Sequence, residues 1–319
     1  MNQVYIPNHI PEYFIYDILH NDNNELIIVI PAEFPLLNIE YLDNGNRVKF
    51  IVNTCLHNHT YVYELQTNYK KDITLIINEN IVNTYVNKYP TFPNEIIFST
   101  LVKNEDKYIV QWIEYHSKIG VSRFIIYDNS DDTTSLNEVL KTYIEENKVI
   151  LFKWSYPFYL RNSGYSAQTT QQTHCNHAFN NSKYIGMFDV DEYINIQKPI
   201  KLNDMLEIII QENNVNVKNI SCFRLLNKFF YNPYNLPTDD YNFLKIYNCD
   251  KISKTGQEKC IVIPKNSNVI SIHFVSNGLQ IYEVDEKYIF FNHYYFLNKT
   301  SRGRNKTDLI DDSIKMHIT

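Results

Sequence analysis

Several features that mark common classes of protein are scarce in this sequence. Among its 319 residues there are only seven glycines, eleven prolines and five cysteines. The cysteines are odd in number and dispersed, at Cys55, Cys175, Cys222, Cys249 and Cys260. Because they contain no C-x-x-C pair, they predict neither a disulfide framework nor a structural zinc site. Reduced thiols in a cytoplasmic setting are therefore expected.

Long apolar runs and an excess of positive charge are missing as well. The longest apolar runs, such as residues 26–31, are far shorter than the ~20 residues that a membrane span needs. The N-terminus MNQVYIPNHIPEYF lacks a basic segment followed by an apolar one, so no signal peptide is expected. A formal net charge of −6 argues against a nucleic-acid partner. A phosphate-bearing ligand would need a metal ion or a few well-placed lysines and arginines.

The remaining composition is that of a globular protein, with 44% hydrophobic and 21% charged residues. Residues 1–92 carry short β-branched and aromatic runs and a turn signal at residues 43–46, which predict a β-rich accessory domain. The proline-containing stretch at residues 89–94 marks the predicted boundary. Residues 93–319 are expected to form the second domain.

From residue 93 the pattern alternates between strands and helices. Strands are predicted over residues 95–101, 123–127, 149–154 and 184–188. Helices are predicted between them, over residues 106–118, 135–146 and 163–179. This alternation predicts a Rossmann-like α/β domain, with a mostly parallel sheet and helices on both faces. Ligands of such sheets bind beyond the carboxyl ends of the strands.

The stretch KYIGMFDVDEYINI, residues 183–196, is the most informative one. Its apolar run predicts a buried strand that ends on Asp189-Val190-Asp191-Glu192. If the segment stays extended, Asp189 and Asp191 share a face, and carboxylates about 4 Å apart repel by roughly 4 kcal/mol at an effective dielectric of ~20. A cation between them is therefore expected. Oxygen ligands suit Mg²⁺ or Mn²⁺, which arrive with a substrate's phosphates. A solvated acidic turn is the alternative.

Two other predicted strands also end on polar residues, Lys103-Asn104-Glu105 and Asp128-Asn129-Ser130. In a parallel sheet all three strand ends lie on the same rim. The sequence therefore predicts a polar site at this rim.

Three blocks of the chain, in this order, resemble glycosyltransferase family 92, the DUF23-type enzymes, and related GT-A glycosyltransferases. They are LVKNEDKYIVQWIEYHSKIGVSRFIIYDNS, MFDVDEYI and FNHYYFLNKTSRGRNK. The likeness runs from about Glu95 to Lys306. It implies a GT-A fold, a UDP-sugar donor, Mn²⁺ or Mg²⁺, and a glycan or glycoprotein acceptor. It further implies transfer of a hexose, with galactose or glucose favoured and inversion of the anomeric configuration.

The resemblance implies that residues at the early strand ends hold the donor nucleotide. Lys103, Asn104 and Glu105 would lie beside the base and ribose, and Asp128 would lie at the base or ribose. Gln168, on the predicted polar helix, could reach the donor. The residues alone leave other interpretations open: an Asx turn that closes a strand for Asp128, and a surface glutamine for Gln168.

The resemblance also implies that Asp189 and Asp191 form the D-x-D motif, which holds the metal ion against the donor diphosphate. A late histidine commonly completes the metal ligands, and His293 is favoured over His273. The basic residues after His293, notably Lys299 and Lys306, would neutralise the phosphates and could close over them as a mobile loop. The alternatives are a packed core histidine and a solvated basic tail. The other histidines, including His174, show no partner pattern and are expected to be structural or at the surface.

An inverting enzyme needs a carboxylate base near the acceptor hydroxyl. Asp240 and Glu258 are the candidates, although either could be a plain surface acid. Two other classes of function remain open. One is a non-catalytic carbohydrate-binding or structural protein on a GT-A scaffold, and the other is a metal-dependent phosphoesterase, which also uses acidic residues with a histidine.

Overall fold

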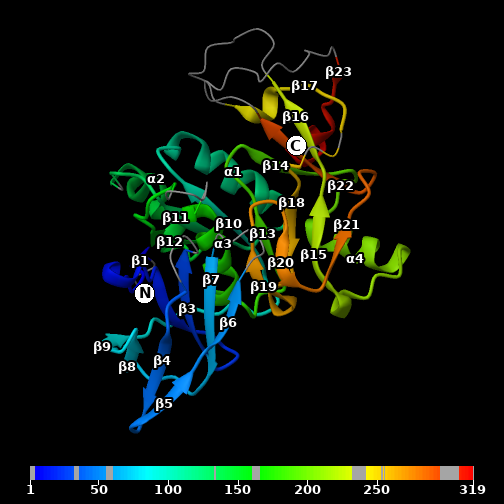
Figure 1. Ribbon diagram of the computed structural model, residues 1–319. Helices are drawn as coiled ribbons and strands as arrows, with labels where there is room; N and C mark the ends of the chain where they lie inside the picture. The colour runs from blue at the N-terminus through cyan, green and yellow to red at the C-terminus, as the bar shows by residue number, and fades with distance from the viewer. Residues whose placement is uncertain are drawn as a thin grey trace.

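The structure is a computed structural model. It describes residues 4–31, 36–54, 60–132, 134–159, 166–231, 242–252, 254, 256–294 and 309–318. An eight-stranded sheet forms its centre (Figure 1). In order across the sheet its strands are β1 (Val4–Tyr5), β12 (Val149–Lys153), β11 (Arg123–Asp128), β10 (Ile96–Val102), β13 (Tyr184–Met187), β18 (Lys259–Val262), β15 (Ile220–Leu225) and β21 (Gln280–Glu283). The first five strands pair in parallel, and β18 is antiparallel to both of its neighbours.

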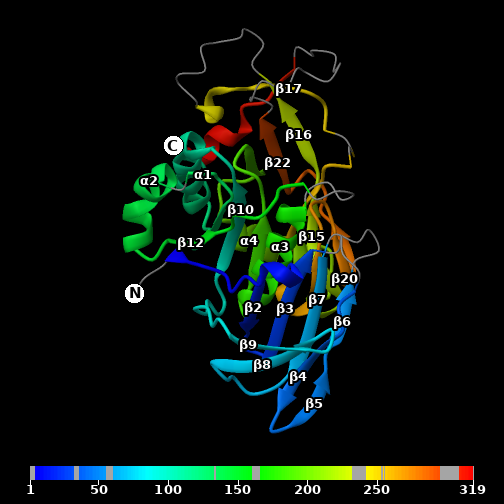
Figure 2. The same ribbon diagram turned by 60° about the vertical axis from the view of Figure 1, so that its left-hand side comes forward.

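Helices cover both faces of this sheet, as Figure 2 shows. One face packs against α1 (Asp106–Lys118), α2 (Thr134–Glu145) and α4 (Leu202–Glu212), and the other packs against α3 (Ser166–Ala178). Alternate residues of a strand point to opposite faces. Accordingly, Phe124 of β11 lies in the core with α1, whereas Ile125 lies in the core with α3. The predicted order of strands and helices between residues 95 and 188 is confirmed.

Helix α3 is an unusual layer, because every one of its residues is buried although its sequence, SAQTTQQTHCNHA, is polar. Neighbouring elements supply hydrogen-bond partners, as buried polar groups require. Gln171 Nε2 donates to Ser99 Oγ at 2.7 Å, and Thr173 Oγ1 donates to the Ile270 carbonyl oxygen at 3.1 Å. The surface position that the sequence allowed for Gln168 is therefore wrong, since only 8% of this residue is exposed.

The N-terminal residues bury α3 from the side opposite the central sheet. They form two four-stranded sheets, in the lower part of Figure 1. The first consists of β2 (Asp17–His20), β3 (Glu25–Pro31), β7 (Thr60–Gln66) and β6 (Ile51–Thr54). The second consists of β5 (Asn46–Lys49), β4 (Ile39–Asp43), β8 (Asp72–Ile77) and β9 (Asn80–Tyr85). Leu19, Ile27 and Val62 of the first sheet share a hydrophobic core with Ala167 and Cys175 of α3.

A third group of strands stands at the opposite end of the molecule, in the upper part of Figure 1. Its five strands, in order, are β14 (Glu192–Ile196), β22 (Ile289–Tyr294), β16 (Asn227–Phe230), β17 (Asn248–Cys249) and β23 (Leu309–Ile310). A separate hairpin pairs β19 (Ser267–Ile270) with β20 (Val275–Gly278). Within the described residues, no helix has the length and apolar character needed to cross a lipid bilayer.

A buried network of polar side chains joins the N-terminal sheet to the central layers. Asp17 of β2 is fully buried, and its Oδ2 lies 2.8 Å from His174 Nε2 on α3 and accepts a 2.5 Å hydrogen bond from Tyr89. Tyr127 of β11 places its hydroxyl 2.7 Å from His174 Nδ1. Burial alone would raise the pKa of Asp17, but the contacts with His174 and Tyr89 outweigh it and hold that pKa below its usual range. His174 is therefore structural, one of the two roles expected for it.

We predict that Asp17→Asn lowers the free energy of unfolding at pH 7 by about 3 kcal/mol, because it breaks a buried pair. The depressed pKa means that Asp17 stabilises the fold above its unfolded pKa of about 4, and that this contribution is lost as the pH falls through its folded pKa. Urea unfolding followed by tryptophan fluorescence at pH 7 and pH 3 measures both effects. The exposed Asp72→Asn is the matched control and should stay within about 0.5 kcal/mol of the parent. A similarly small change for Asp17→Asn would contradict the assignment.

Candidate functional site

The parallel strands end at a common rim, where the polar residues singled out in the sequence lie. The register pairs Val102 of β10 with Asp128 of β11, and Asp128 with Lys153 of β12. Strand β13 runs parallel to β10 on its other side, so Asp189 follows at the same rim. The predicted convergence of the three strand ends is therefore observed.

The acidic segment after β13 is a tight turn rather than an extended strand end. The Glu192 amide donates to the Asp189 carbonyl oxygen at 3.0 Å, and β14 begins at Glu192. Val190 is buried, with 2% of its surface exposed. The expectation that Asp189 and Asp191 share a face of an extended segment is therefore wrong. The two carboxylates have different neighbours.

Asp189 is held by a lysine that the sequence did not single out. Strand β18 is antiparallel to β13, with Gly186 opposite Ile261, so its first residue, Lys259, arrives beside the end of β13. Lys259 Nζ lies 2.8 Å from Asp189 Oδ2 and 3.2 Å from Glu192 Oε2. Only 1% of the Lys259 side chain is exposed. The one signal in the sequence was a lysine directly before an apolar strand.

Helix α3 supplies the second contact of Asp189. Gln168 Nε2 donates to Asp189 Oδ1 at 2.8 Å, so both carboxylate oxygens accept a hydrogen bond. The burial of α3 fixes the position of this glutamine. Gln168 therefore supports the acidic turn directly, through the first residue of the turn.

The pKa values of Asp189 and Glu192 are shifted in opposite directions, because the two residues have different surroundings. Burial would raise the pKa of Asp189, but the charge and hydrogen bond of Lys259 outweigh it and lower that pKa. Burial dominates at Glu192 and raises its pKa well above the usual range. The two acidic partners together raise the pKa of Lys259 despite its burial. Asp189 and Lys259 thus form a charged pair at neutral pH.

His293 lies across from Asp191, the third residue of the D-x-D motif. Strand β22 is antiparallel to β14 and pairs His293 with Glu192. His293 Nε2 is 3.7 Å from Asp191 Oδ2, and His293 Nδ1 is 3.7 Å from Glu192 Oε1. The side chains of Asp191 and His293 are 28% and 15% exposed. The favoured late histidine is therefore beside the predicted carboxylate.

His273 lies beside Glu258, the residue that precedes Lys259. His273 Nδ1 is 3.1 Å from the Glu258 carbonyl oxygen, and burial together with the charge of Lys259 lowers the pKa of His273. Glu258 is 7% exposed, and its Oε1 accepts a 3.2 Å hydrogen bond from the Gly256 amide. Of the other predicted site residues, Asp240, Lys299 and Lys306 lie outside the described residues.

The loop after β10 carries the predicted nucleotide-side residues. Asn104 has a positive φ of 55°, and its amide donates to Ser130 Oγ at 3.0 Å, which ties this loop to the one after β11. Asparagine tolerates this left-handed conformation better than most residues. Lys103 is exposed and lies 4.0 Å from Asp131, and Glu105 directly precedes α1.

Asp128 closes β11 with an Asx turn, which was one of its two expected roles. Its Oδ1 accepts a 2.9 Å hydrogen bond from the Ser130 amide. Its Oδ2 is buried and accepts no hydrogen bond from the part of the chain that the structure describes. Burial raises the pKa of this carboxyl group. An unsatisfied carboxylate oxygen at a strand end is a suitable acceptor for ligand hydroxyl groups.

No group of three or more His, Cys, Asp or Glu side chains among the described residues is arranged to hold a metal ion. The metal ligands expected from the sequence are Asp189, Asp191, His293 and His273. They lie in the acidic turn or beside it, but they do not converge on one point. A metal site at this turn stays a prediction.

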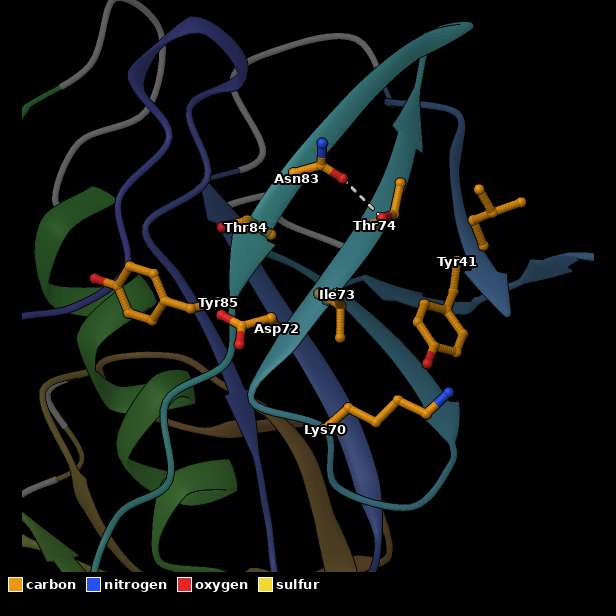
Figure 3. Close-up of a pocket in the computed structure, with 9 residues that line it drawn as sticks. Tyr41, Lys70, Asp72, Ile73, Thr74, Asn83, Thr84 and Tyr85 are labelled. Atoms are coloured by element: carbon orange, nitrogen blue, oxygen red, sulfur yellow. Dashed lines mark hydrogen bonds between the residues drawn. The ribbon is translucent and has the colours of Figure 1, made fainter. Parts of the chain in front are cut away.

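A wide groove of about 550 Å³ lies elsewhere, on strands β4, β8 and β9 (Figure 3). Its lining includes Tyr41 and Tyr85, and Thr74 Oγ1 donates to Asn83 Oδ1 at 2.8 Å. Figure 3 shows the two tyrosines on opposite sides of the groove. Tyr41 is 3% exposed and Tyr85 is 42% exposed, so Tyr85 supplies most of the aromatic surface that these two residues offer to a ligand. None of the predicted site residues lines it.

The chain was compared with family models, with curated proteins and with solved structures. The family model described as glycosyltransferase family 92 matches residues 96–317. A glycosyltransferase family 92 protein of Ricinus communis is 26% identical over 212 residues, which are 64% of this chain and 36% of that protein. A glycosyltransferase family 92 protein of Oryza sativa subsp. japonica is also 26% identical, over 204 residues, which are 62% of this chain and 32% of that protein. The chain thus spans about a third of the length of these relatives.

A solved structure of the mannosyltransferase Ktr4p from S. cerevisiae, in complex with GDP, also matches. It is 12% identical and aligns over 44% of this chain and 41% of that chain, with a TM-score of 0.25. A TM-score of this size does not establish a shared fold.

We predict that Asp128→Asn raises the free energy of unfolding at pH 7. The folded pKa of Asp128 lies above its unfolded value, so the ionised carboxylate destabilises the fold above that folded pKa, and this penalty vanishes below about pH 4. Asparagine removes the charge and can keep the hydrogen bond from Ser130. Urea unfolding of both proteins should show a gap at pH 7 that closes at pH 4. A less stable Asp128→Asn protein at pH 7 would contradict this account.

Proposed function

This chain belongs to glycosyltransferase family 92, and we propose that it transfers a hexose from a UDP-sugar to a hydroxyl group of a glycan or glycoprotein, with a divalent metal ion. The family resemblance read from the sequence is confirmed. The activity, the donor, the metal and the acceptor are parts of the proposal. The observation that carries it is the acidic turn at the carboxyl end of β13, with His293 beside Asp191.

We further propose that residues 93–319 have the GT-A architecture. The parallel strands β12, β11, β10 and β13, with helices on both faces, support this proposal, as does the antiparallel β18 beside β13. In open α/β sheets a ligand binds outside the carboxyl ends of the strands. In this chain that rim carries Asn104, Asp128 and the acidic turn.

The side chains at the acidic turn fit a divalent cation. Asp191 Oδ2 and His293 Nε2 are 3.7 Å apart, too far for a hydrogen bond between them. Two ligand atoms each about 2.1 Å from one ion are at most roughly 4.2 Å apart, so a single Mn²⁺ or Mg²⁺ can contact both. Such an ion, when bound, would stabilise the negative charge of the leaving diphosphate. One or two protein ligands completed by substrate phosphates are usual for Mg²⁺.

The other residues of the rim have roles toward the donor nucleotide in this proposal. Asp128 Oδ2 would accept hydrogen bonds from the base or ribose hydroxyls. Asn104 positions the loop after β10 against that nucleotide, through its bond to Ser130. Lys103, which is exposed, would lie beside the base and ribose. These roles rest on the family resemblance and on the location of the three side chains.

Among the described residues, Glu258 is the candidate for the base that takes the proton from the acceptor hydroxyl. It precedes Lys259 and lies at the same rim, and inversion would require such a base within reach of the acceptor hydroxyl. Asp240 is the second candidate. Both assignments belong to the proposal.

A nucleotide-sugar panel with Mn²⁺ tests the function directly. We expect UDP-galactose or UDP-glucose to raise the melting temperature and to be hydrolysed slowly to UDP in the absence of acceptor. Release of inorganic phosphate instead would favour the phosphoesterase. Binding of glycans without any turnover of nucleotide sugars would favour a carbohydrate-binding protein.

We predict that Asp191→Ala lowers the rate of donor turnover at least 100-fold, because it removes a proposed metal ligand worth several kcal/mol of charge stabilisation. Its melting temperature should stay within about 3 °C of the parent, since the side chain is 28% exposed. Turnover assays and thermal melts give both values. The exposed Asp312→Ala serves as the control. An active Asp191→Ala enzyme would rule out this role.

A further inference from the structure

Lys259 is a buried cation that none of the roles above explains. Its side chain is 1% exposed, yet its ammonium group lies between two carboxylates of the acidic turn. Burying an ammonium group is costly unless charged partners and hydrogen bonds compensate it. The partners are Asp189 Oδ2 at 2.8 Å and Glu192 Oε2 at 3.2 Å. The fold therefore maintains this lysine at a specific place.

That place is the one a divalent cation would need in order to be shared by Asp189 and Glu192. Asp189 is also engaged on its other oxygen, Oδ1, by the Gln168 amide. Both oxygens of Asp189 thus accept hydrogen bonds from protein groups. Asp191 does not contact Lys259 within ion-pair distance and instead lies 3.7 Å from His293.

We infer that Lys259 is the built-in counter-ion of the acidic turn: it excludes Asp189 from metal coordination, so that a divalent cation binds strongly only together with the donor's phosphates. This inference rests on the proposed function and changes the role that the sequence suggested for Asp189. Asp189 becomes a positioning residue that holds Lys259 and Gln168. Asp191 and His293 then offer the protein ligands.

The physical basis is the number of ligands and the local charge. Two protein ligands leave most positions around a six-coordinate ion to water, so binding by the protein alone is weak. The diphosphate of a donor adds further oxygen ligands and negative charge. A third protein ligand, the Asp189 carboxylate, would remove this dependence, and Lys259 prevents it by its position and its charge.

Binding of Mn²⁺ to the full chain in the absence of nucleotide tests the inference. We expect Lys259→Met to bind Mn²⁺ at least tenfold more tightly than the parent in calorimetry, because Asp189 becomes available as a ligand. Mn²⁺ should also raise the melting temperature of Lys259→Met more than that of the parent. Adding Asp189→Asn to Lys259→Met should abolish the gain. An Mn²⁺ affinity of Lys259→Met equal to or below that of the parent would overturn the inference.

The parent background provides an independent arm. Asp189→Asn and Asp191→Asn each remove one negative charge from the acidic turn, so their nucleotide-free Mn²⁺ affinities can be compared directly. Asp191→Asn should cause the larger loss, because only Asp191 is a metal ligand in this inference. An equal or larger loss for Asp189→Asn would overturn the inference, and this comparison does not depend on the folding of Lys259→Met.

The charge-preserving Lys259→Arg is the matched control and should keep the weak nucleotide-free affinity of the parent. Mn²⁺ binding is measured without any donor, so its outcome is independent of transferase activity. A gain in Lys259→Met in a protein that turns over no nucleotide sugar would support the exclusion of Asp189 by Lys259 but refute the proposed function. Turnover of a nucleotide sugar without such a gain would support the proposed function and overturn the inference.

Discussion

The ion pair between Lys259 and the acidic turn is the interaction on which the arrangement of the site depends. The turn joins β13 of the eight-stranded sheet to β14 of the five-stranded sheet, and Lys259 contacts a carboxylate at each end of it. The sheets are therefore tied together where their strand ends carry polar residues. Since a buried charge without its partner is strongly destabilising, this pair fixes the turn in one conformation. Asp191 is thereby directed toward His293 on β22.

Much of the central fold could be predicted because its elements follow local rules. Helix α1 spans residues 106–118 as predicted, since Ile109, Trp112 and Ile113 recur on one face and Gly120 follows with a φ of 103°. The environment of α3 could not be predicted in this way. A helix that is polar on all sides gives no periodic signal. Helix α3 is buried because the N-terminal sheet packs against it, and the sequence of the helix alone does not reveal this long-range contact.

The site was predictable in part, for a similar reason. The acidic motif and the late histidine are local sequence signals, and the structure brings Asp191 and His293 together. Two features were missed. The chain makes a tight turn between Asp189 and Glu192 before β14 begins, so the expected extended geometry was wrong. Lys259 reaches Asp189 only through the antiparallel pairing of β18 with β13, which spacing along the chain does not reveal.

The short strand β1 has a consequence for how the gene can be divided. Val4 and Tyr5 extend the central sheet beyond β12, while the strands that follow lie against α3 on the far side. A protein that begins at residue 96, where the family match starts, would lack β1 and the N-terminal sheets. The edge of β12 would then be open to intermolecular strand pairing, and the polar side chains of α3 would lose the layer that covers them. Division of the chain at that point would therefore separate layers that bury each other's surfaces.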